Sequence, residues 1–138
     1  MVSGNWFKEY KIQNDDIKEI YLEYILDDEQ KMLVQTYNRF KDAVRIVSAD
    51  PKELLKEMPN IPEEVAMIFN DECVSFAKDL LTSNCIDDKI YNLIRRLDKL
   101  FKSLNNDRTI NVWTIESMYS DIRWIKTRVI AQSLYILL

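Results

Sequence analysis

Hydrophobic residues recur at intervals of three and four positions along most of the chain, which is the period of an α-helix. The first such stripe follows Asn14, a residue type that caps helix N-termini. The stripe consists of Ile17, Ile20, Tyr21, Tyr24 and Ile25. We therefore expect an amphipathic helix after Asn14, with this stripe facing the core.

The same period continues to the C-terminus. It predicts further helices over about 28–47, 51–58, 61–83 and 87–104, and one from about 112 to near the C-terminus. The connections between them are short, as is typical of antiparallel neighbours in a bundle. The sequence thus predicts a single all-α domain over 1–138, a helical bundle of five to six helices, with 1–13 as a loosely ordered N-terminal segment.

The last predicted helix is apolar on two sides. Its expected core stripe is Ile115, Met118, Ile122, Ile125 and Val129. Trp113, Trp124 and Tyr135 lie within about 40° of one another on the opposite side. A helix of this kind is typical of the centre of a bundle, packed front and back. The alternative is that Trp124, beside Arg128, belongs to an exposed binding strip, because Trp and Arg are enriched at interface hot spots.

The composition narrows the chemistry. Gly4 is the single glycine, and histidine is absent. One glycine disfavours folds that need many tight turns, and it excludes glycine-rich phosphate-binding loops. Without histidine the chain lacks the usual general base and the commonest transition-metal ligand. We therefore expect no catalytic residues, no metal and no cofactor.

The two cysteines are too few for a disulfide scaffold or a four-thiolate zinc site. Cys73 falls on a core stripe, whereas Cys85 lies between helices and is expected to be more exposed. No run of about 20 apolar residues predicts a membrane span. The first residues lack the apolar run of a signal peptide, so we expect a cytoplasmic protein with reduced thiols.

Charge is unevenly distributed along the chain. The net charge is −4, which argues against nucleic acid as the partner. Residues 1–72 hold 16 acidic and 9 basic side chains, whereas residues 73–138 hold 7 and 10. Such polarity either pairs internally or presents an acidic face to a basic partner. A basic strip in the second half could bind phosphate or nucleic acid, or it could pair internally or form a solvated face; it comprises Arg95, Arg96, Lys99, Lys102 and Arg108.

The densest acidic strip lies on the first predicted helix. Four of its carboxylates fall within about 80° on a helical wheel. They are Asp16, Glu19, Glu23 and Asp27, and Asp28 continues the run. A solvated helix face is one interpretation, and a surface that steers a basic protein partner is the other. On the second interpretation, the candidate partner-binding residues are these five together with Trp124 and Arg128.

The C-terminal sequence NVWTIESMYSDIRWIKTRVIAQSL resembles the C-terminal ends of small immunity proteins from bacterial polymorphic toxin and contact-dependent inhibition systems. The matching residues are Trp113, Tyr119, Ile122, Arg123, Trp124 and Ala131. The resemblance covers the last third to half of the chain. It implies a small acidic cytoplasmic protein that covers the active site of a cognate toxin, and it implies no catalytic residues.

The leading hypothesis is therefore a protein-binding inhibitor, an immunity protein that neutralises a nuclease toxin with a basic cleft. One alternative is an acidic helical adaptor or phage-type inhibitor that mimics nucleic acid. Another is an enzyme with a carboxylate-based site, built from Glu63, Glu64, Asp71 and Glu72. The oligomeric state does not follow from the sequence.

Overall fold

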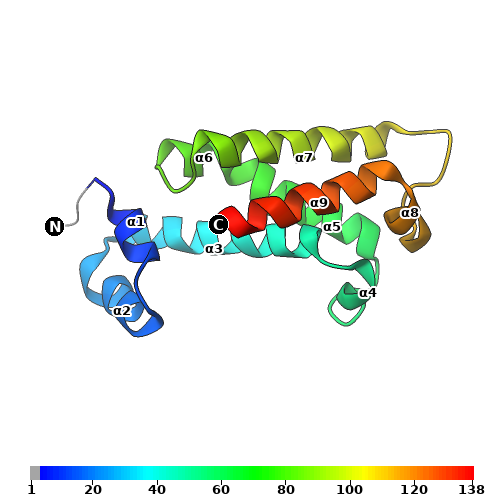
Figure 1. The fold of residues 1–138 in the computed structure, drawn as a ribbon. Helices are drawn as coiled ribbons and strands as arrows, with labels where there is room; N and C mark the ends of the chain where they lie inside the picture. Colours follow the sequence, from blue (N-terminus) through cyan, green and yellow to red (C-terminus); the bar gives the residue numbers. More distant parts are fainter. Residues whose placement is uncertain (1–3) are drawn as a thin grey trace.

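Four helical segments form the frame of the computed structural model, which describes residues 4–138 (Figure 1). Three of them are single helices: α3 (Asp28–Ser48), α7 (Asp88–Asn106) and α9 (Ile122–Leu137). The fourth, which we call the bent run, consists of α5 (Ile61–Phe69), the π-helical turn η2 (Asn70–Val74) and α6 (Ser75–Thr82) in succession. The bent run and α9 each pack against both α3 and α7. The described residues contain no strand, and their buried side chains form one core cluster. The predicted all-α bundle is confirmed.

The remaining helices are short and lie outside this frame. They are α1 (Trp6–Lys11), α2 (Asp15–Ile20) with the π-helical turn η1 (Tyr21–Ile25), α4 (Pro51–Leu54) and α8 (Ile115–Ser120). Figure 1 shows α2 and α4 standing off from α3 near its two ends. α4 begins at residue 51, where the helical period predicted a helix. The Asp50 carboxylate accepts a hydrogen bond from the Lys52 amide, and Pro51 is the first helical residue.

The expected loose N-terminal segment is instead partly helical. Residues 1–3 of that segment lie outside the described residues, but α1 occupies much of the remainder. Phe7 and Tyr10, one helical turn apart, are both buried. The Phe7 ring lies 4.7 Å from the ring of Tyr37 on α3. Burial of these aromatic rings orders the segment, and this term outweighs the weak helix propensity of so short a stretch.

The single helix expected from about residue 112 is interrupted. The chain is extended at Asp121, with ψ of 125°, and this residue ends α8 and caps α9. Its carboxylate accepts a hydrogen bond from the Arg123 amide at 2.8 Å. The Arg123 guanidinium lies 2.8 Å from Asp121 and 2.8 Å from Asp107. We call the contacts of Arg123 with Asp107 and Asp121 the clamp; they fix where α9 begins.

The interruption sets which side of α9 faces the core. Trp124 is only 2 % exposed and packs between the rings of Phe101 and Trp113, at 5.6 Å and 5.7 Å. Its indole N–H donates a 2.9 Å hydrogen bond to the Val112 carbonyl, so the buried polar atom is satisfied. Trp124 is a core residue, and its assignment to a partner-binding surface is wrong.

The opposite side of α9 faces outward. Ile122 is 59 % exposed, Val129 54 % and Ile136 84 %. Two of these residues belong to the stripe that the sequence assigned to the core. The buried positions are instead Trp124, Thr127, Ala131 and Leu134. Restarting the helix at Asp121 allows the large indole to enter the core and leaves the aliphatic row without a packing partner.

This packing makes a stability test possible. Trp124→Ala should lower the free energy of unfolding by about 3–5 kcal/mol, because it opens a cavity and removes the ring contacts. Val129→Ala on the outward side should stay within about 0.5 kcal/mol of the parent. Urea denaturation measures both. Equal effects of the two substitutions would contradict this assignment of the two sides.

The clamp at Arg123 makes the stability depend on pH. Hydrogen bonds from Thr109, and then from Arg123, hold the pKa of Asp107 far below its usual range. A depressed pKa in the folded state means that the charged carboxylate stabilises the fold above its unfolded pKa of about 3.9, and that this contribution is lost as pH falls further.

We expect Asp107→Asn to reduce the urea midpoint at neutral pH, and the gap to the parent to shrink as pH falls below about 4. Asp71→Asn, which removes an exposed carboxylate on η2, serves as the control. A gap of constant size between neutral and acidic pH would show that the Asp107 charge contributes nothing to stability.

Candidate protein-binding surface

The acidic strip lies on a small projection that we call the acidic lobe, formed by residues 15–28 (Figure 1). Two caps define it. The Asn14 side chain accepts a 3.0 Å hydrogen bond from the Ile17 amide and starts α2. Asp27 and Gln30 exchange hydrogen bonds of 2.8 Å and 2.9 Å in a capping box that starts α3. The Asn14 cap was predicted from the sequence, and the two caps together fix the bounds of the lobe.

Apart from Tyr21, the apolar stripe of the lobe does not face the core, contrary to expectation. Neither α2 nor η1 contains a buried residue. Ile17 is 36 % exposed, Ile20 45 % and Tyr24 77 %. The lobe meets the body through Tyr21, a member of the stripe that is partly buried; its ring lies 6.0 Å from that of Tyr10. An apolar row this exposed is typical of an interaction surface.

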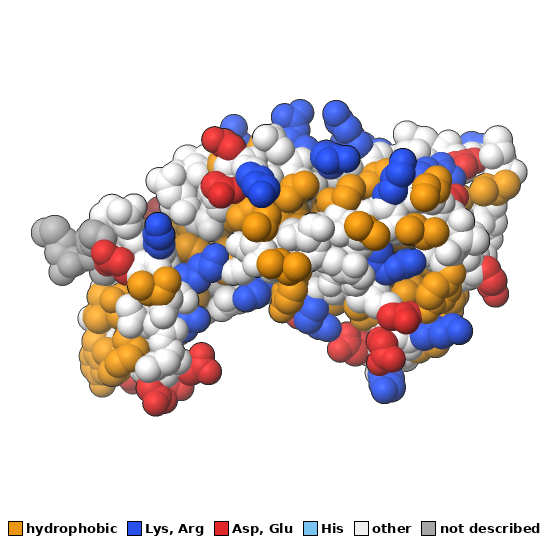
Figure 2. Space-filling view, viewed as in Figure 1, with side chains coloured by type: hydrophobic (Ala, Val, Ile, Leu, Met, Phe, Trp, Pro, Cys, Tyr) orange, Lys and Arg blue, Asp and Glu red, His pale blue; other side chains and the backbone are white. Residues whose placement is uncertain are grey.

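The predicted carboxylates flank this row. Asp16, Glu19, Glu23, Asp27 and Asp28 are all exposed. Within the described part of the chain none of them forms an ion pair. Figure 2 shows hydrophobic side chains along the outer edge of the lobe and carboxylates at its lower end. The lobe therefore offers an apolar row beside a negative row, and only Asp27 has a further structural role, as a cap.

The uneven charge of the chain is not neutralised by direct pairing between its halves. Among the described residues, every ion pair joins two side chains from the same half; examples are Arg39 with Glu72 at 2.6 Å and Arg123 with Asp107 at 2.8 Å. Of the two interpretations of the charge polarity, internal pairing is therefore excluded for direct contacts over these residues. The negative charge of the lobe faces solvent.

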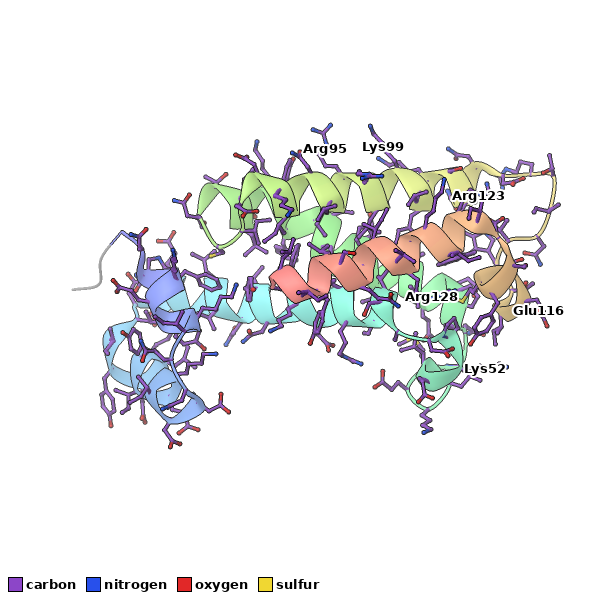
Figure 3. All side chains as sticks on the ribbon, viewed as in Figure 1. Lys52, Arg95, Lys99, Glu116, Arg123 and Arg128 are labelled. Atoms are coloured by element: carbon purple, nitrogen blue, oxygen red, sulfur yellow. The ribbon has the colours of Figure 1, made fainter. Side chains whose placement is uncertain are left out.

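Arg128 lies apart from the acidic lobe. It is half-buried, and its guanidinium donates a 2.7 Å hydrogen bond to the Met118 carbonyl. The same group lies 5.5 Å from the ring of Tyr119, as does the ammonium of Lys52, and the Tyr119 hydroxyl hydrogen-bonds Asp50. Figure 3 shows Arg128 and Lys52 at the α4 end of the molecule. The structure therefore gives Arg128 a role in joining α8 and α9 to α4, and does not bring it together with the acidic residues.

A hollow of about 680 Å³ lies between α1 and the turn from α6 to α7. Cys85 lines it and is buried; at 5 % it is only slightly more exposed than Cys73, at 0 %. Burial raises the pKa of its thiol to about 11, so the weakly nucleophilic protonated form dominates near neutral pH. The neighbouring Asp87 carboxylate caps α7 through the Ile90 amide. This hollow thus holds no activated nucleophile.

The carboxylates considered for acid–base chemistry are dispersed. Glu63, Asp71 and Glu72 line three different open hollows. Glu72 is also engaged by Arg39. Over residues 4–138, no group of three or more His, Cys, Asp or Glu side chains converges as metal ligands would. The best-formed candidate site on the described surface is therefore the acidic lobe.

Comparison with protein-family models, with curated proteins and with solved structures gives no match to this chain. No helix in the described part of the chain has both the length and the apolar character required to cross a lipid bilayer.

The exposure of the lobe's apolar row is testable by mutation. The double variant Ile20→Ser, Tyr24→Ser should have a free energy of unfolding within about 1 kcal/mol of that of the parent, because neither side chain is buried. Leu26→Ala, at the base of the lobe, should cost about 2–5 kcal/mol because Leu26 is buried. Urea denaturation compares them. A double variant as unstable as Leu26→Ala would mean that the row packs against the body.

Proposed function

We propose that this chain is a protein-binding inhibitor of the immunity-protein type, whose acidic lobe binds a basic toxin, most simply a nuclease. The observation that carries the proposal is the lobe itself. It holds an exposed apolar row and unpaired carboxylates side by side. Charge complementarity accelerates encounter and selects the partner, and the apolar row supplies contact area that slows dissociation.

The resemblance of the C-terminal segment to immunity proteins supports the same class. In this structure that segment builds the core through Trp124 and the clamp at Arg123. We therefore assign its matching residues to the scaffold and the recognition to the lobe. The proposed setting is a reducing cytoplasm, in keeping with Cys73 and Cys85 being buried free thiols.

Site-specific photo-crosslinking in the native host tests the proposal. A photoreactive phenylalanine analogue at position 24 should capture a basic protein, identified by mass spectrometry. The matched control carries the analogue at position 110, where Ile110 is also exposed, in the loop between α7 and α8. Equal capture from both positions would place the binding surface elsewhere.

The captured protein is then tested as a toxin and as a ligand. Its expression alone should arrest growth, and co-expression of the parent chain should relieve the arrest. The variant Asp16→Asn, Glu19→Gln, Glu23→Gln should associate about tenfold more slowly at low salt, with a weaker salt dependence. Asp27 is left intact because it caps α3. If the captured protein does not arrest growth, the immunity assignment is refuted. If the association rate of the variant is unchanged, the role of the lobe is refuted.

A further inference from the structure

The outward side of α9 is a second surface without a packing partner. Ile122, Val129 and Ile136 are spaced by seven residues and lie within about 40° of one another. They point away from the buried side that carries Trp124 and Ala131. Large aliphatic side chains of this exposure, aligned along one side of a helix, are a candidate for a protein contact.

Cations border this aliphatic row on both sides. The Arg123 guanidinium, at the start of α9, donates to the Ser103 carbonyl at 3.2 Å, so the row of α7 that contains Ser103 lies along α9. Arg96 lies one heptad before Ser103 on that row, and Lys89 lies two heptads before it; both are exposed.

On the other side of α9, the ammonium of Lys41 on α3 lies 5.6 Å from the ring of Tyr135. Lys126 is exposed beside the aliphatic row itself. None of Lys41, Lys89, Arg96 and Lys126 forms an ion pair with a described residue.

Figure 2 shows the result on the face turned to the viewer: hydrophobic side chains over α9, with Lys and Arg side chains above and below them. Figure 3 shows that Arg95 and Lys99 add further positive charge along α7. We call this surface the α9 face, defined by Ile122, Lys126, Val129 and Ile136 with the flanking Lys41, Lys89 and Arg96. It is the chemical complement of the acidic lobe, with an apolar row beside positive charge instead of negative.

We propose that the acidic lobe of one copy docks on the α9 face of a second copy. The aliphatic rows of the two helices then pack together, and the lobe carboxylates face the cations of α7 and α9. Each copy has one lobe and one α9 face, so a closed two-fold pair makes the contact twice. A small contact of this kind is expected to have a dissociation constant on the order of micromolar. Because the lobe is also the proposed toxin-binding site, self-association and toxin binding would compete.

Sedimentation velocity on the purified chain tests the proposal without any partner, so its outcome is independent of the proposed function. We expect a concentration-dependent dimer that weakens with salt. The lobe variant Asp16→Lys, Glu19→Lys, Glu23→Lys should raise the dissociation constant at least tenfold, and so should the face variant Lys89→Glu, Arg96→Glu, Lys126→Glu. The control reverses three exposed cations outside the α9 face, so it changes the net charge as much as the face variant does. It is Lys56→Glu, Lys78→Glu, Arg108→Glu, and it should leave the dimer intact.

The decisive sample is a mixture of the lobe variant and the face variant. Each lobe then finds an α9 face of opposite charge, so mixed pairs should form although neither variant pairs with itself. Val129→Ser should weaken the parent dimer without loss of stability. The proposal is overturned by a parent chain that stays monomeric at all concentrations, by a dimer that the lobe variant does not weaken, or by a mixture that fails to associate. Binding of a monomeric parent to anionic lipid vesicles would assign the α9 face to a membrane surface instead.

Discussion

The extended residue at Asp121 is the constraint on which the rest of the arrangement depends. It ends α8, caps α9 and, through Arg123, ties the start of α9 to Asp107 at the end of α7. With the start of α9 fixed, the helical period decides which residues face inward. Trp124 enters the core between Phe101 and Trp113, and the aliphatic row faces solvent. One local capping interaction thus determines both the core and the surface of the last helix.

The two unpartnered surfaces have a common physical origin. A frame of four helical segments has a limited interior, and the rings of Phe69, Phe101 and Trp124 occupy part of it. Apolar stripes beyond that capacity stay outside, on α9 and on the acidic lobe. Each stripe carries charge of one sign beside it, negative on the lobe and positive around α9. Exposed apolar rows with charged borders favour selective contacts over indiscriminate aggregation, because like-charged neighbours repel.

Local signals predicted much of this structure. Asn14 caps α2 as its position in the sequence indicated, and α3 and α4 begin at Asp28 and Pro51, where the helical period predicted helices to start. The carboxylates of the lobe lie on one exposed projection. The short interval between the caps at Asn14 and Asp27 was a signal that the intervening helix is small and could stand off from the core. Trp124 was misassigned to the binding surface, because its periodicity fits a core and an interface equally well.

The sequence by itself determined the helical class, the caps, the absence of histidine chemistry and the polarity of charge, because these follow from residue type and spacing along one segment. The tertiary structure alone decided which apolar side of each amphipathic segment is buried. That choice depends on competition between segments for a shared interior: Trp124 excludes Val129 from the core, and Phe7 takes a place beside Tyr37 while Tyr24 remains in solvent. Periodicity describes one helix at a time, so it cannot settle a competition among several.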